Sequence, residues 1–206
     1  MKTQKIFWGT AGITYTTQAI LLRKIKLSET SLIISWLTEK HGAIKTVARG
    51  ARNLKSQYAG QLDLFYRAEI HFALSRRGEL HQLREVFLQS TCSGLRVSYD
   101  HLRLAAYFVE LIELVTEREY PVPELFDLLH RALAYLDRGE PTRKVLLHFE
   151  AETARLLGIW ERKNSSLMPE QALCRTYGRL PQARAALLEA MPEVQATPKA
   201  RAHKTP

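Results

Sequence analysis

The sequence predicts an α+β protein in which a small antiparallel β-barrel or sandwich precedes a bundle of helices. Short aliphatic runs separated by turn signals fill residues 17–90. After Cys92-Ser93-Gly94 the apolar residues recur every three or four positions, as in helices. The excess of positive charge also lies in the first part. We expect four regions: an extension (1–16), a barrel (17–91), a helical domain (92–190) and a disordered tail (191–206).

Five runs are predicted as strands. They are "AILLRKIKL" (19–27), "TSLIISWLT" (30–38), "GAIKTVARG" (42–50), "LFYRAEIHFAL" (64–74) and "ELHQLREVFL" (79–88). The fifth run contains good helix formers, but its neighbourhood favours a strand. It follows the fourth run after Ser-Arg-Arg-Gly, a hairpin signal in which Gly78 is available for positive φ.

The later part of the chain carries the residues that usually begin and end helices. In the segment 98–118, Ser98 is a suitable N-cap and Asp100 falls in the first turn. Two further segments, 121–139 and 140–158, have a proline in their first two positions (Pro121 and Pro141) and end at glycine, the usual helix asymmetry. Segments 166–178 and 180–191 read as shorter helices. The apolar positions of the first helix are Leu104, Tyr107, Phe108, Leu111, Ile112 and Val115.

Composition excludes several classes of protein. No run approaches eighteen apolar residues, so we expect no membrane span, and the N-terminus is a poor secretory signal. Cys92 and Cys174 are expected to be free thiols in a reducing cytoplasm. The histidines are dispersed and no cysteine pair has ligand spacing, so we expect no metal and no cofactor. No serine elbow is present, and the carboxylates of Glu110, Glu113 and Glu117 on one predicted helix face are expected to be a solvated face, which argues against an enzyme.

Net charge is +9, and its distribution is uneven. Residues 1–91 hold 14 Lys and Arg against 6 Asp and Glu, whereas residues 92–190 hold 13 against 14. This asymmetry indicates that the first module meets a polyanion while the second has another role.

The stretch 43–62 concentrates these cations, with no acidic residue before Asp63. Gly50 and the β-branched Thr46 and Val47 argue against a helix. A phosphate-binding P-loop fails because Leu54 stands where that loop needs a glycine. As a strand that ends near Gly50, the stretch places Lys45, Val47 and Arg49 on one face.

A positive groove with an aromatic ring is typical of sequence-tolerant nucleic-acid binding. Arg52 and Lys55 extend the charge along a loop, and Tyr58 beside them could stack on bases. A solvated cationic loop is the alternative. Arg76 and Arg77 in the hairpin would clamp the same backbone from a second side, or simply keep the hairpin soluble.

Several strings resemble the bacterial RecO family of recombination mediators. They are "SETSLIISWLTEKHGAIKTVARGARNLKSQYAGQLDLF" (28–65), "YFVELIELV" (107–115) and "PELFDLL" (123–129). The resemblance implies an N-terminal OB-fold, a C-terminal helical domain and residence in the bacterial cytoplasm at the nucleoid. By position, Arg49, Arg52 and Lys55 fall on the family's basic string. Many members carry four zinc-binding cysteines in the helical domain, where this chain has only Cys174.

The resemblance also implies function. Members bind single- and double-stranded DNA and anneal complementary strands. They help load RecA together with RecR and the C-terminal tail of the single-strand-binding protein. The alternative is a protein-interaction adaptor whose barrel is structural. The candidate nucleic-acid-binding residues are Arg23, Lys45, Arg49, Arg52, Lys55, Tyr58, Arg76 and Arg77.

Overall fold

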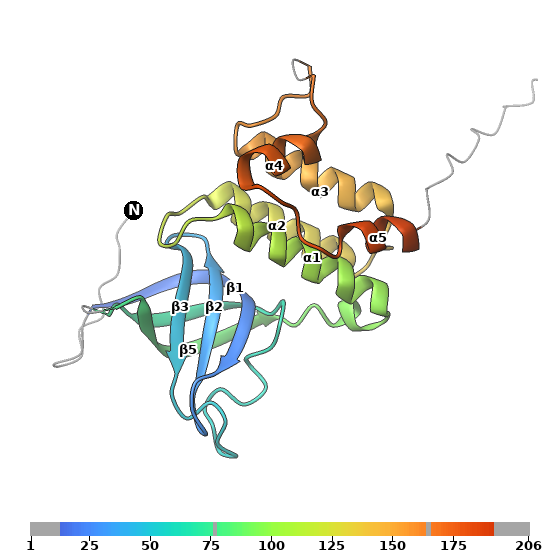
Figure 1. The fold of residues 1–206 in the computed structure, drawn as a ribbon. Coiled ribbons are helices and arrows are strands. Elements are labelled where there is room, and N and C mark those ends of the chain that lie inside the picture. Colours follow the sequence, from blue (N-terminus) through green and yellow to red (C-terminus); the bar gives the residue numbers. More distant parts are fainter. Residues whose placement is uncertain (1–12, 76–77, 164–165, 192–206) are drawn as a thin grey trace, which may run out of the picture.

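A computed structural model describes residues 13–75, 78–163 and 166–191 and confirms the α+β prediction (Figure 1). Arg76, Arg77, and most of the expected extension and tail lie outside these ranges. The strands are β1 (Thr14–Lys26), β2 (Leu32–Thr38), β3 (Gly42–Ala48), β4 (Arg67–Ala73) and β5 (Leu80–Ser90). A 3₁₀ turn (Ser93–Arg96) precedes the helices α1 (Tyr99–Val115), α2 (Pro123–Leu136), α3 (Arg143–Leu156), α4 (Pro169–Tyr177) and α5 (Arg184–Ala190).

The strands close into a barrel in the order β1-β2-β3-β5-β4. Only β3 and β5 pair in parallel among these neighbours, and the other pairs are antiparallel. A five-stranded barrel of this kind is an OB-fold. The hairpin of β4 and β5 is confirmed, and so is the strand assignment of the fifth run.

β1 is long enough to serve two neighbours. It begins at Thr14, before the expected start of the barrel at residue 17, because Thr14–Ile20 pairs with β4. Its later residues pair with β2, and a register shift between Leu21 and Arg23 bends the strand around the barrel.

Side-chain alternation fills the barrel. In β3, Ile44, Thr46 and Ala48 are buried while the residues between them are partly exposed. The interior is packed by Trp36, Ile70 and Phe72, all fully buried. The indole Nε1 of Trp36 donates to Oγ1 of Thr46 over 2.9 Å, so the polar atom inside this apolar core is satisfied.

The helices lie over one end of the barrel, with α1 and α2 next to it and α3 and α4 beyond them (Figure 1). Ser98 caps α1 as expected, since its hydroxyl accepts from the His101 amide. All six predicted apolar positions of α1 are buried. Arg184 ties α5 to α3, with its Nε 2.7 Å from Oε1 of the buried Glu150, which also accepts from the Tyr107 hydroxyl of α1. Among the described helices, none has the length and apolar character to cross a bilayer.

Barrel and bundle share an apolar core. Ile20, Leu22 and Leu37 point outward from the barrel and join the cluster built by the helices, together with Phe65 from the β3–β4 connection (residues 49–66). At the edge of this interface Arg23 Nε lies 2.7 Å from Oε2 of Glu113 on α1. The helices therefore cover one end of β1 and β2, and the α1–α2 connection meets β3 at Ala43, while Lys45 and Val47 farther along β3 stay partly exposed.

Candidate nucleic-acid interface

The outer surface of β3 carries the cations that the alternation predicts. Lys45 and Val47 are partly exposed on this surface, and Arg49 follows just beyond the strand end, where it is exposed. The predicted common face of these three residues is confirmed, because the residues between them point into the barrel.

β5 carries a further arginine on the outer surface of the barrel. The last paired position of the two parallel strands is Val47 with Gln82, and Arg84 follows two residues later in β5. Leu83 points into the barrel, so Arg84 points outward, on the same side as Val47 and Gln82. Arg84 was not among the predicted residues. The signal for it was the alternation of β5, but only the parallel pairing with β3 places it there.

The side chains of Lys45, Arg49 and Arg84 form no hydrogen bond or ion pair with any other described residue. The same holds for Lys55, which is exposed in the β3–β4 connection. Unpaired cations gathered on one side of a barrel leave their charge available to an anionic ligand. We call Lys45, Arg49 and Arg84 the cationic face.

Arg52 does not belong to this face. Its Nη1 donates to the backbone oxygens of Ser28 (3.0 Å) and Glu29 (2.9 Å), and its own amide donates to Thr30. Its guanidinium ties the β3–β4 connection to the β1–β2 turn, and the predicted contact of Arg52 with DNA stays a prediction.

The prediction for Tyr58 is corrected. The ring is 4% exposed and packs in the barrel core, so it offers no face for base stacking. Its hydroxyl donates to the carbonyls of Leu83 (3.0 Å) and Arg84 (3.2 Å). An aromatic ring flanked by polar loop residues looks exposed in a sequence, but here the connection folds back over the open barrel end.

Arg23 is engaged as well, through the ion pair with Glu113 that joins barrel and helices, in which the single Nε faces both carboxylate oxygens. A nucleic-acid contact by Arg23 would have to compete with that carboxylate. Arg76 and Arg77 lie outside the described residues, so their predicted contacts stay predictions.

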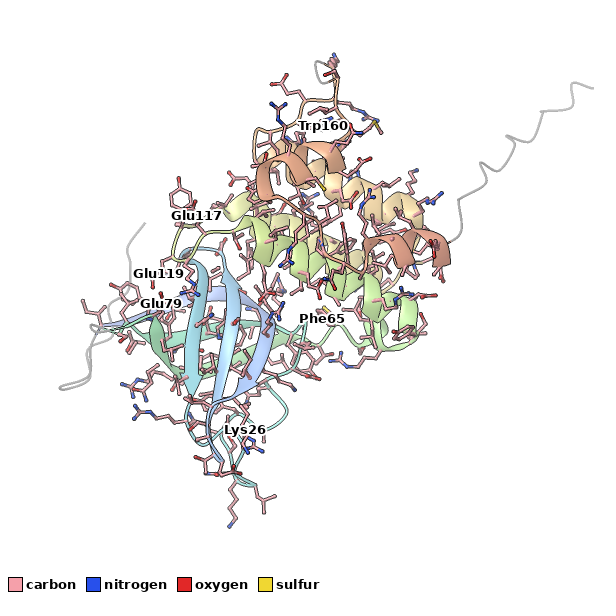
Figure 2. The ribbon with its side chains drawn as sticks, viewed as in Figure 1. Lys26, Phe65, Glu79, Glu117, Glu119 and Trp160 are labelled. Atoms are coloured by element: carbon pink, nitrogen blue, oxygen red, sulfur yellow. The ribbon has the colours of Figure 1, made fainter. Side chains whose placement is uncertain are left out.

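Carboxylates lie next to the cationic face at the end that carries Lys45. A cavity of about 220 Å³ beside Lys45 is lined by Glu79, Glu113 and Glu119, and Arg118 pairs with Glu79. Figure 2 shows Glu79 and Glu119 at the barrel end nearest the helices and Lys26 at the opposite end. Because carboxylates repel phosphates, a polyanion on this face is drawn toward the end that carries Arg49 and Arg84.

A separate cleft of about 730 Å³ lies between the barrel and α2–α3. Both signs of charge line it: Arg67 at the start of β4, Arg131 on α2 and Arg155 on α3, and the carboxylates of Glu39, Glu124 and Asp127. Leu156 of α3 adds apolar surface. Arg131 and Arg155 are paired with carboxylates of their own helices. Arg67 has a buried Nε without a hydrogen-bond partner among the described residues.

His130 lies beside Arg67 in the same cleft. Burial lowers the pKa of His130, and the positive charges of Arg67 and Arg131 lower it further against the opposing effect of Asp127. The imidazole is therefore neutral at pH 7, and Arg67 is the cation without an ion-pair partner among the described residues that line this cleft.

Other chemistry finds little support in the described chain. It contains no group of three or more His, Cys, Asp or Glu side chains placed to hold a metal ion. Cys92 is buried, and burial raises the pKa of its thiol despite the Ser90 hydrogen bond, so it is a poor nucleophile.

Comparison with known proteins gives consistent matches. The family model "Recombination protein O N terminal" matches residues 13–91, and "Recombination protein O C terminal" matches residues 96–160. "DNA repair protein RecO" of Rhodopirellula baltica is 36% identical over 68% of this chain and 52% of its own length. The proteins of the same name from Myxococcus xanthus (31%; 73% and 62%) and Synechococcus elongatus (35%; 60% and 46%) are also similar. The chain spans about half the length of the curated relatives it matches.

Proposed function

This chain belongs to the RecO family, and on that premise we propose that it is a DNA-binding recombination mediator without a catalytic activity of its own. The observation that carries the proposal is the cationic face. OB-folds bind oligonucleotides on the outer surface of strands 2 and 3, and the unpaired Lys45 and Arg49 lie on that surface.

Phosphate contacts suit a mediator. Lysine and arginine bind the DNA backbone without reading its sequence, so the same face accepts any strand. We propose that the chain binds single- and double-stranded DNA, anneals complementary strands and helps load RecA in the bacterial cytoplasm at the nucleoid. The four cations that we assign to DNA are Lys45, Arg49, Lys55 and Arg84.

The cleft between barrel and helices is our candidate site for a protein partner. Arg67 offers an unpaired cation there, and Leu156 offers apolar surface. A segment that brings one carboxylate to Arg67 and an apolar side chain to Leu156, away from Glu39 and Glu124, fits that lining. We propose that the C-terminal tail of the single-strand-binding protein docks in this cleft, and that RecR is a further partner.

Salt dependence tests the DNA proposal. Lys45→Gln, Arg49→Gln and Arg84→Gln together remove three phosphate contacts. The slope of log K against log salt for a labelled single strand should fall in magnitude by about 2, at roughly 0.7 per contact.

A matched control removes three exposed charges from the helical domain, through Arg138→Gln, Arg175→Gln and Arg179→Gln. This variant should keep the slope of the parent. Equal slopes in all three proteins would leave the barrel as a structural module and favour the adaptor alternative.

A further inference from the structure

An aliphatic strip crosses the barrel surface beside the cationic face. Ile25 of β1 pairs with Ile33 of β2, and Ile33 pairs with Val47 of β3. The three side chains thus lie in one row across three adjacent strands, about 10 Å from first to last at the usual strand spacing.

The strip faces solvent rather than a core. Ile25 is 53% exposed, and Ile33 and Val47 are partly exposed. In the described chain none of the three belongs to the barrel core or to the helical core. Ile33 and Val47 lie beside the inward-pointing Ile34 of β2 and Thr46 of β3, and Ile25 lies between the exposed Lys24 and Lys26. The barrel interior therefore does not need these three side chains to be apolar.

Cations lie on both sides of the strip. Val47 stands between Lys45 and Arg49, which are about 13 Å apart at 3.3 Å per residue. Arg84 lies beyond Gln82, the β5 partner of Val47. A ligand on this surface would therefore meet positive charge on either side of an apolar row.

A single nucleic-acid strand has this pattern, since its phosphates are anionic and its unpaired bases are flat and poorly hydrated. The charge pattern disfavours an apolar face of a second copy of the chain, because Lys45 and Arg49 would be desolvated without partners. In a duplex the bases are stacked inside and cannot reach a strip that lies level with the cations.

We propose that Ile25, Ile33 and Val47 contact the bases of unpaired nucleotides, and that this contact makes the barrel prefer single-stranded over duplex DNA. The inference rests on the proposed function, because the cationic face must hold the backbone for the bases to reach the strip. The contact is sequence-tolerant, since aliphatic side chains accept any base face.

The test compares an oligothymidylate with an abasic oligomer of the same length and with a duplex. Ile25→Thr, Ile33→Thr and Val47→Thr remove apolar surface while keeping β-branched side chains that suit strands. The parent should bind the oligothymidylate about tenfold more tightly than the abasic oligomer, and the strip variant should reduce that ratio to about one. The strip variant should keep the parent's affinity for the duplex and the parent's slope of log K against log salt.

A control variant carries the same substitution at exposed apolar positions off the strip: Ile13→Thr, Leu88→Thr and Val97→Thr. It should keep the parent's ratio. Should the triple strip variant fail to fold, Ile25→Thr alone should lower the ratio by about twofold, because this side chain is the most exposed of the three.

The outcomes separate the two proposals. The inference is overturned if the strip variant keeps the parent's ratio of oligothymidylate to abasic affinity while the variant with Gln at positions 45, 49 and 84 lowers the salt slope. The proposed function then stays intact. A parent that binds neither oligomer in a salt-dependent way overturns both. If the variant with Gln at positions 45, 49 and 84 binds both oligomers more weakly by the same factor, the cations contact phosphates and the strip contacts bases, as proposed.

Discussion

At the residue scale, Tyr58 shows how the β3–β4 connection is held against the barrel. Its ring fills the barrel core and its hydroxyl donates to two carbonyls of β5. Burial raises the pKa of this phenol, against the effects of Gln57 and Arg84, so the hydroxyl keeps its proton and remains a donor. The β3–β4 connection, which carries the exposed Lys55, is therefore anchored to β5 at Tyr58.

Replacement of Tyr58 separates stability from binding. Tyr58→Phe keeps the ring and removes the hydroxyl, which leaves the carbonyls of Leu83 and Arg84 with one donor fewer. We expect the unfolding free energy in urea to fall by about 1 kcal/mol. Oligonucleotide affinity well below the melting temperature should stay unchanged. A large loss of affinity with unchanged stability would restore Tyr58 as a DNA contact.

At the element scale, the β2–β3 turn and the α1–α2 connection are fitted together. The amide of Glu119 donates to the carbonyl of Ala43 over 3.0 Å, and Arg118 forms an isolated bridge with Ala43. Gly42 has φ +66°, and a Cβ there would lie 2.3 Å from the carbonyl oxygen of Tyr120. The absence of a side chain at Gly42 thus allows the helical domain to close the end of the barrel.

Two glycines with similar backbone angles test this fit. Gly60 has φ +72°, but a Cβ at this position would meet no other atom within 4 Å. Gly60→Ala should cost about 1 kcal/mol, the strain of a left-handed alanine. Gly42→Ala should cost about 3 kcal/mol, because overpacking adds to the same strain. If both variants lose the same unfolding free energy in urea, the α1–α2 connection moves away from the added methyl group without cost.

At the scale of the whole molecule, the barrel and the helices are bound by one apolar interface. Ile20, Leu22, Leu37 and Phe65 from the first half lie in the core of the second. The ion pair of Arg23 with Glu113 crosses the same boundary, although it is partly exposed and contributes little to stability. The two parts should therefore unfold together rather than as independent domains.

Unfolding without metal tests this view of the molecule. We expect a single urea transition by both circular dichroism and tryptophan fluorescence, with the same midpoint before and after dialysis against a chelator. The reason is that apolar burial holds the described helices. Two separated transitions would contradict the shared core, and stoichiometric zinc lost together with stability would contradict the expectation that no metal is needed.

The sequence by itself determined the local structure, because hydrophobic period, caps and turn residues act over a few positions. The five strands, the helices and the shared face of Lys45 and Arg49 follow from such patterns. The family resemblance was equally readable, since it rests on contiguous strings.

Tertiary structure alone decided which cations are available. Arg52 and Arg49 look equivalent in the sequence, but the carbonyls that engage Arg52 lie in the β1–β2 turn, 23 and 24 residues away. Arg84 lies on the same side of the barrel as Lys45 and Val47 only because β3 and β5 pair in parallel. The aliphatic strip likewise exists only as a row across three strands. Contacts between distant segments depend on barrel closure and register, and no short-range pattern of residue types encodes them.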